Sequence, residues 1–236
     1  VLNPEFARLL ESLANGVVIA DPAGTIIFSN QFAEGMFGYA PGELRGLSVD
    51  VLLPGELRER HAHHRLQYSA APETRLMGEG RDLLGRRKDG SVFPVEVGLS
   101  VMKTPEGTRI VAIVTDITTR KHAEQQSILQ RDVALILSKA DTIQSVASNL
   151  LETIGGSLGW RLGALWLVDA EARTLRNAAF WRARGVEAPA FEAISRRVSF
   201  RMGESFPGKV WETGKPVWVP ELATVGGVVR SAEAGS

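Results

Sequence analysis

The sequence predicts an α+β protein with a five-stranded antiparallel sheet domain at residues 1–118, a helical linker at 119–140 and a second α/β sheet domain at 141–236. Three observations support this division. Short β-branched runs separated by turn residues fill the first part, and a run without Gly or Pro follows it. Another amphipathic helix, followed by further strand-like runs, fills the last part.

The first 30 residues predict a helix and then a hairpin. Asn3 is a suitable N-cap and Pro4 suits the first helical position, and apolar residues recur at helical spacing as far as Leu13. Two apolar β-branched runs then flank the turn sequence DPAG at residues 21–24. Such a turn between two strand-like runs is typical of a tight hairpin.

The sheet is completed after a helical crossing. Residues 31–68 predict short helical pieces interrupted by Gly and Pro, ending in a longer helix from about Gly55 to Tyr68. Three strand-like runs follow, joined by the turn sequences KDGS at 88–91 and TPEG at 104–107. Two strands, the crossing and three more strands make up the five-stranded antiparallel sheet, with helices on one face.

The linker predicts an extended helix. Residues 119–139 contain no Gly or Pro, and Ala123, Ile128, Val133 and Ile136 stand on a background of Gln, Arg and Glu. This apolar pattern favours pairing with a second copy of the same helix, and therefore a homodimer, although a solitary solvated helix fits the short pattern as well.

The second domain begins with another amphipathic helix. Apolar residues from Ile143 to Ile154 follow the helical period, and Gly155 and Gly156 are expected to end the helix. Residues 161–181 then predict a strand, a polar turn and a second strand.

Composition excludes several classes of partner and chemistry. Equal numbers of basic and acidic residues, 27 of each, leave no net field to attract nucleic acid or an anionic membrane. No apolar run approaches the roughly 18 residues of a membrane span, and no signal peptide pattern opens the chain. The absence of cysteine excludes a cysteinyl-flavin adduct and a thioether-linked bilin. We therefore expect a cytoplasmic protein.

Two family resemblances follow from particular motifs. Residues from about 5 to 120 resemble a PAS domain through the segments DPAGTIIFSN, FGY, ELRG and GRRKDGSVFPVEVGLS and the closing IVTDITTRKHAE. The segments LGWRLGALWLVD and GESFPGKVWETGKPVWVPEL resemble the first part of a GAF domain, which would be incomplete at residue 236. The resemblance implies that Asp116 and Thr118 lie at the PAS exit, where movement of the sensor passes into the following helix.

A PAS domain, a helix and a GAF domain in this order resemble the input end of bacterial sensor histidine kinases and of cyclic-dinucleotide enzymes. The resemblance implies a sensory and dimerising module of a two-component phosphorelay protein, with its output domain elsewhere in a longer parent chain. The parent is expected to be a histidine kinase. No activated nucleophile or acid–base pair is recognisable, so no catalytic residue is assigned.

Three histidines lie close together in the segment RERHAHHRLQY at residues 58–68. At helical spacing, His61 and His64 continue the apolar stripe of Leu53 and Leu57, whereas His63 points away. A zinc site would need further ligands, and none is found at a recognisable spacing.

The same segment and the strands after it resemble the rhizobial oxygen-sensing haem-PAS kinases. This resemblance implies that His61 binds the haem iron and that Arg81 donates a hydrogen bond to bound oxygen. The sequence departs from that family at Gln67, which replaces a propionate-binding arginine, and at Arg75, which replaces a histidine and could contact a propionate instead. In the alternative, His61 and His64 are half-buried helix residues, and the cavity binds a small apolar ligand or none.

Overall fold

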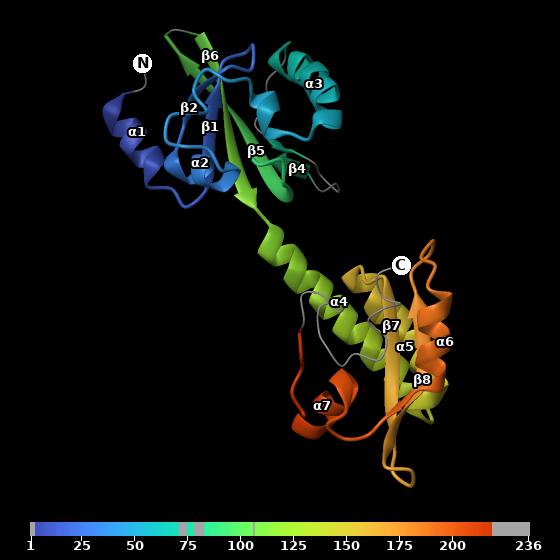
Figure 1. Ribbon diagram of the computed structural model, residues 1–236. Helices are drawn as coiled ribbons and strands as arrows, with labels where there is room; N and C mark the ends of the chain where they lie inside the picture. Colours follow the sequence, from blue (N-terminus) through green and yellow to red (C-terminus); the bar gives the residue numbers. More distant parts are fainter. Residues whose placement is uncertain (1–2, 71–74, 78–82, 106, 219–236) are drawn as a thin grey trace. The chain divides into compact units, whose positions relative to one another are not determined.

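The computed structural model describes residues 3–70, 75–77, 83–105 and 107–218 (Figure 1). The chain divides into two compact units, residues 1–122 and 123–236. Each unit has a sheet of its own. The boundary between the units falls within the helix α4, Thr118–Ser138.

The first unit contains the predicted antiparallel sheet, with strands in the order β2-β1-β6-β5 and with β3 and β4 both paired to β5. The short strands β3 and β4 pair with successive parts of β5, so the sheet is five strands wide. Strand β3 lies outside the predicted strands. The bounds are β1 Gly16–Ala20, β2 Ile26–Ser29, β3 Arg75–Met77, β4 Leu83–Arg86, β5 Val92–Thr104 and β6 Gly107–Asp116.

Helices of the first unit pack on both faces of this sheet. Ala33 and Phe37 of α2, together with Leu52 of η1, join Val18 and Ile26 in the larger core cluster. On the opposite face, α1 packs against β1 (Figure 1). The bounds are α1 Pro4–Glu11, α2 Gln31–Phe37, η1 Val49–Leu52, η2 Gly55–Leu57 and α3 Arg58–Ala70.

The N-terminal elements form for the reasons that the sequence indicates. The Asn3 side chain accepts a hydrogen bond from the Glu5 amide at 2.9 Å, and Pro4 occupies the first helical position of α1. Strands β1 and β2 pair as an antiparallel hairpin, and Gly24 in the turn has a φ of 88°. The predicted helix from Gly55 begins as the 3₁₀ turn η2 and continues as α3.

Helix α4 (Thr118–Ser138) follows β6 almost directly. Only Ile117 separates the last residue of the strand, Asp116, from the first residue of the helix. The predicted linker helix is confirmed, and a strand that crosses the first unit is continuous in sequence with it.

The second unit has a three-stranded antiparallel sheet in the order β7-β8-β9. Ala147 and Leu151 of α5 pack against Ala179 of β8. The predicted helix and two strands are therefore present. The bounds are α5 Ile143–Leu158, β7 Leu162–Asp169, β8 Thr174–Arg182, α6 Pro189–Arg197, β9 Ser199–Phe200 and α7 Ser205–Thr213.

One helix boundary in the second unit was predicted wrongly. Helix α5 continues through Gly155 and Gly156 to Leu158, and Gly159 at a φ of 66° forms its C-cap. Gly155 has a packing role instead: a Cβ at this position would lie 2.4 Å from the Trp181 ring. The missing side chain lets α5 approach β8 closely.

In the part of the chain that the structure describes, no helix is both long and apolar enough to cross a membrane.

Candidate ligand cavity

A cavity of about 680 Å³ lies in the first unit between the sheet and the helical crossing. This volume falls within the range of roughly 300–1,000 Å³ that is usual for small-molecule sites. Its sheet wall is apolar and its helical wall carries two histidines. The sheet wall includes Val18, Val95, Val97, Leu99, Ile110, Ala112 and Val114, and the helical wall includes Val49, Leu52, Leu53, Leu57, His61 and His64.

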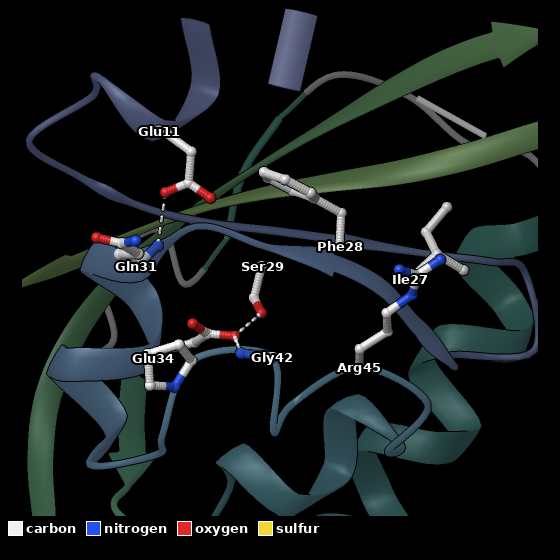
Figure 2. Close-up of a pocket in the computed structure, with 9 residues that line it drawn as sticks. Glu11, Ile27, Phe28, Ser29, Gln31, Glu34, Gly42 and Arg45 are labelled. Atoms are coloured by element: carbon white, nitrogen blue, oxygen red, sulfur yellow. Dashed lines mark hydrogen bonds between the residues drawn. The ribbon is translucent and has the colours of Figure 1, made fainter. Parts of the chain in front are cut away.

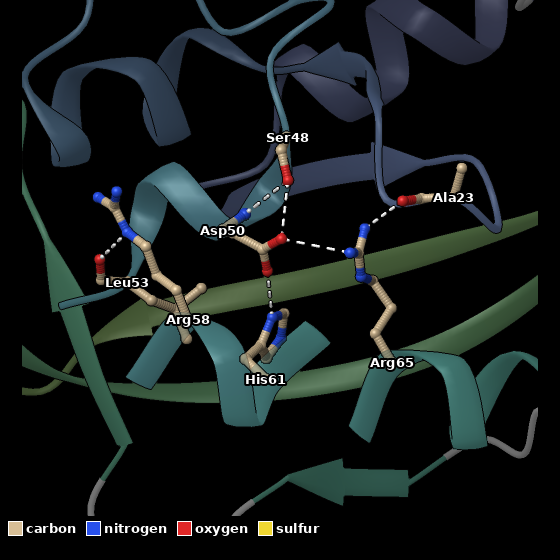
Figure 3. Close-up of polar contacts among 7 residues, drawn as sticks. All are labelled: Ala23, Ser48, Asp50, Leu53, Arg58, His61 and Arg65. Carbon is tan, nitrogen blue, oxygen red and sulfur yellow. Dashed lines mark hydrogen bonds and ion pairs between the residues drawn. The ribbon is translucent and has the colours of Figure 1, made fainter. Parts of the chain in front are cut away.

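The imidazole of His61 contacts a carboxylate from the 3₁₀ helix η1 (Figure 3). Its Nδ1 lies 2.7 Å from Oδ1 of Asp50, and the other carboxylate oxygen of Asp50 lies 3.2 Å from Nη2 of Arg65. Arg65 also donates to the carbonyl of Ala23 in the β1–β2 turn. Because an ionised carboxylate only accepts, Nδ1 of His61 carries the proton and Nε2 is left as the nitrogen available to a ligand.

The Asp50 carboxylate stays ionised within this network. Burial raises its pKa, but hydrogen bonds from His61 and Ser48 and the positive charge of Arg65 outweigh burial and hold the pKa below its usual value. The Ser48 hydroxyl donates to Oδ2 of Asp50 at 2.9 Å. Asp50 therefore connects η1, α3 and the β1–β2 turn through one negative charge.

Asp50→Asn is expected to lower the free energy of unfolding of the first unit by about 1–2 kcal/mol at pH 7, because charged hydrogen bonds are replaced by neutral ones. The folded-state pKa lies below the unfolded value of 3.8. The stabilisation is therefore complete well above pH 3.8 and is lost as the pH falls through the folded pKa. Denaturant unfolding at several pH values should show the two proteins converging in acid.

The matched control for this prediction is Asp132→Asn in α4, where the carboxylate lies 3.4 Å from the neighbouring Arg131 and pairs with no other described residue. This control should change stability little at any pH. An Asp50→Asn deficit that persists unchanged below pH 3 would contradict the electrostatic explanation.

A second polar cluster lies where β6 ends and α4 begins. Asp116 accepts from the Thr118 amide at 2.9 Å and lies 3.0 Å from Nη2 of Arg87. Arg87 also donates to the carbonyl of Met36 in α2, and its guanidinium stacks 3.8 Å from the centre of the Phe93 ring. Burial raises the pKa of Asp116, but hydrogen bonds from Thr118 and Arg87 outweigh burial and lower it.

The predicted cofactor residues are therefore placed as follows. His61 and His64 both line the cavity, and His63 is not among its lining residues. Arg75 lies in β3, but its side chain, like the whole of Arg81, lies outside the described residues. Among the described residues, no group of three or more His, Asp or Glu side chains is placed to hold a metal ion.

A smaller cavity of about 230 Å³ lies near α2 and β2 (Figure 2). Its buried carboxylate, Glu34, accepts from the Ser29 hydroxyl and the Gly42 amide, both at 2.8 Å. Glu11 likewise accepts from the Gln31 amide at 2.8 Å. These carboxylates hold the adjoining backbone segments in place, and the volume is below the roughly 300–1,000 Å³ that is usual for small-molecule sites.

Asp50, Arg65 and Arg87 were not predicted from the sequence as partners in these clusters. Arg87, the residue directly after β4, donates to the carbonyl of Met36 in α2 and to Asp116. A single carboxylate 11 residues before a histidine has no helical or strand periodicity to reveal the contact. The signal that was present is the Ser48–Asp50 pair, a local cap at the start of η1.

An antiparallel sheet with a cavity beneath a helical crossing places this unit in the α+β class. Residues 14–119 match the family model described as PAS domain. These residues belong to the PAS domain family, as the motifs predicted.

Two curated relatives share this part of the chain. Sensor protein FixL of Bradyrhizobium diazoefficiens is 28% identical over 122 residues, which cover 52% of this chain and 24% of FixL. Cell-division control histidine kinase PdhS of Brucella ovis is 27% identical over 122 residues, which cover 52% of this chain and 12% of PdhS. The first unit is thus homologous to parts of sensor kinases, and the chain spans a quarter or less of their length.

A solved structure is also similar to this chain. It is the PAS domain of an HTR-like protein from Haloarcula marismortui, with 25% identity and a TM-score of 0.40 over 48% of this chain and 89% of that one.

Proposed function

We propose that the PAS domain senses a small molecule in the cavity beneath α3 and passes the signal through β6 to helix α4. The observation that carries this proposal is that strand β6 both lines the cavity and leads into α4. Ile110, Ala112 and Val114 of β6 line the cavity, and the same strand ends two residues before α4 begins. A ligand that displaces these side chains acts on the strand that leads into the helix.

The cluster of Asp116, Thr118 and Arg87 is the proposed relay. Asp116 caps the first turn of α4 through the Thr118 amide and pairs with Arg87, the residue directly after β4. A shift of β6 relative to β4 alters both contacts together. Two arrangements of this cluster would give α4 two positions, which is the kind of bistable element that a signal requires.

We further propose that the chain is the input part of a cytoplasmic sensor histidine kinase. The homology of its first unit with FixL and PdhS supports this proposal. The alternative is the input part of a cyclic-dinucleotide enzyme, with the GAF-like second unit common to both. Incubation of the full-length gene product with radiolabelled ATP should yield an acid-labile, alkali-stable phosphohistidine. Formation of a cyclic dinucleotide from GTP would instead support the alternative.

A haem-based gas sensor is a second candidate function, which the His61–Asp50 contact favours. Histidines that bind a metal almost always donate their other ring N–H to a carboxylate, a carbonyl or water, and Asp50 accepts such a bond from Nδ1. His61 would hold the iron through Nε2, and the apolar sheet wall would pack against the porphyrin. Bound haem would supply an iron centre for a diatomic gas.

If haem is the ligand, reconstitution of the full chain with haemin should give a Soret band with one equivalent of haem, and His61→Ala should abolish it. His63→Ala is the matched control, because this histidine lies on the same helix but outside the cavity lining. Absorbance titration measures both. A Soret band unchanged in His61→Ala would end the haem hypothesis and leave the sensory proposal intact.

We propose that α4 also pairs with its counterpart in a homodimer. Ile128 and Leu135 are 49% and 54% exposed and lie seven residues apart, the repeat of a coiled-coil seam. Ile128→Glu with Leu135→Glu should shift sedimentation equilibrium from dimer to monomer. Ile143→Glu in α5, which is 50% exposed, is the control and should leave the dimer intact. A wild-type monomer at high concentration would refute the pairing.

A further inference from the structure

The two sides of the cavity beneath α3 differ in chemistry. Among the described residues, the sheet wall is formed by aliphatic side chains from β1, β6 and β5, together with Leu83, Leu84 and Gly85 of β4. Neighbouring strands lie about 4.8 Å apart, so this wall offers an apolar surface roughly 10 Å across. The α3 wall adds Arg60, His61, His64 and Arg65. A ligand that fills the cavity therefore meets hydrocarbon on one side and nitrogen donors on the other.

The four donors on α3 are not equally available. His61 and Arg65 are already engaged by Asp50, at 2.7 Å and 3.2 Å. Arg60 and His64 are exposed, lie one helical turn apart, and have no hydrogen bond or ion pair with another described residue. They are thus a guanidinium and an imidazole left open at the cavity wall.

Negative charge on the described cavity wall is limited to one side chain. Asp21 belongs to the lining, and its Oδ1 accepts from the Thr25 amide at 2.8 Å within the β1–β2 turn. Asp50 is neutralised by its own partners. The guanidinium of Arg60 therefore has no described carboxylate as a partner and can pair with an anionic ligand.

We propose that the cavity binds a small amphipathic carboxylate. Its apolar body lies against β1, β6 and β5, and its carboxylate pairs with Arg60 and accepts a second hydrogen bond from His64. This inference rests on the proposed sensory role of the cavity and names the class of molecule sensed. Arg60 is the specificity-determining residue, because its guanidinium matches the geometry of a carboxylate.

The test uses calorimetric titration of the full chain with octanoate and with 1-octanol, which have the same apolar body and differ in charge. Protein without a Soret band is used, so that a porphyrin, which also carries carboxylates, does not occupy the cavity. Octanoate should bind at least about tenfold more tightly than octanol. Arg60→Gln with His64→Gln should remove this preference and leave octanol binding unchanged.

Arg45→Gln is the matched control, because Arg45 is an exposed arginine of the same unit outside this cavity, and it should retain the preference. Equal affinity of the wild type for both ligands would overturn the carboxylate class while leaving the cavity as a sensory site. If neither octanoate nor octanol binds, the proposal that the cavity binds an amphipathic carboxylate is also wrong. The sensory role is tested independently by filling the cavity from its helical wall, with Leu57→Trp, and following α4.

Discussion

Asn30→Ala is expected to lower the free energy of unfolding of the first unit by about 3–5 kcal/mol, enough to unfold a marginal domain. Asn30 is fully buried. Its Oδ1 accepts from the amides of Val17 and Ala33, and its Nδ2 donates to the carbonyls of Leu10 and Asn15, all at 2.9–3.0 Å. Alanine removes the acceptor of the buried Val17 and Ala33 amides, at about 1–3 kcal/mol each when water cannot replace the bond.

The measurement is hydrogen exchange of β1 (Gly16–Ala20) in the full chain, since all five tryptophans lie in residues 160–218 and their fluorescence reports on the second unit alone. Asn15→Ala is the matched control, because only the backbone carbonyl of Asn15 is used in this contact. If β1 exchanges equally fast in Asn30→Ala and Asn15→Ala, the hydrogen bonds of the Asn30 side chain do not stabilise the first unit.

Gly155→Ala is expected to destabilise the second unit by about 1–3 kcal/mol, although alanine ordinarily stabilises a helix relative to glycine. The reason is steric: the new Cβ would lie 2.4 Å from the Trp181 ring, within a core cluster that contains Leu151 and Ala179. Denaturant unfolding followed by tryptophan fluorescence measures the change, because Trp181 reports from the site of the clash.

The neighbouring glycine of α5 provides the control. A Cβ on Gly156 would meet no atom within 4 Å. Gly156→Ala should therefore stabilise the second unit by about 0.5–1 kcal/mol through helix propensity alone. Substitutions at adjacent positions are thus expected to have opposite signs. Stabilisation by both would mean that α5 and β8 do not approach as closely as the structure indicates.

Elements with local causes could be predicted from the sequence. The N-cap at Asn3, the turn at 21–24 and the absence of Gly and Pro from residues 119–139 each act within a few residues, and the corresponding elements formed as expected. The period of α3 also placed His61 and His64 correctly on the side of the cavity.

Features that depend on distant contacts could not be predicted. The Asp50–His61 pair joins η1 to α3, and its two residues share no periodic pattern. Gly155 carried the usual signal of a helix end, but tertiary packing against Trp181 decides its role. Strand β3 is three residues long, too short for its alternation to be recognised without its partner β5.

The most direct test of the central claim is hydrogen exchange of the full chain with the cavity filled by Leu57→Trp. The substitution enters from the helical wall of the cavity that Ile110, Ala112 and Val114 of β6 also line. If the signal passes from the cavity through β6, exchange should change in β6 and in α4 (Thr118–Ser138), and the α4 change should be lost when Asp116→Asn is added. Altered exchange confined to η2 and α3, with β6 and α4 unchanged, would contradict a signal path from the cavity to the linker helix.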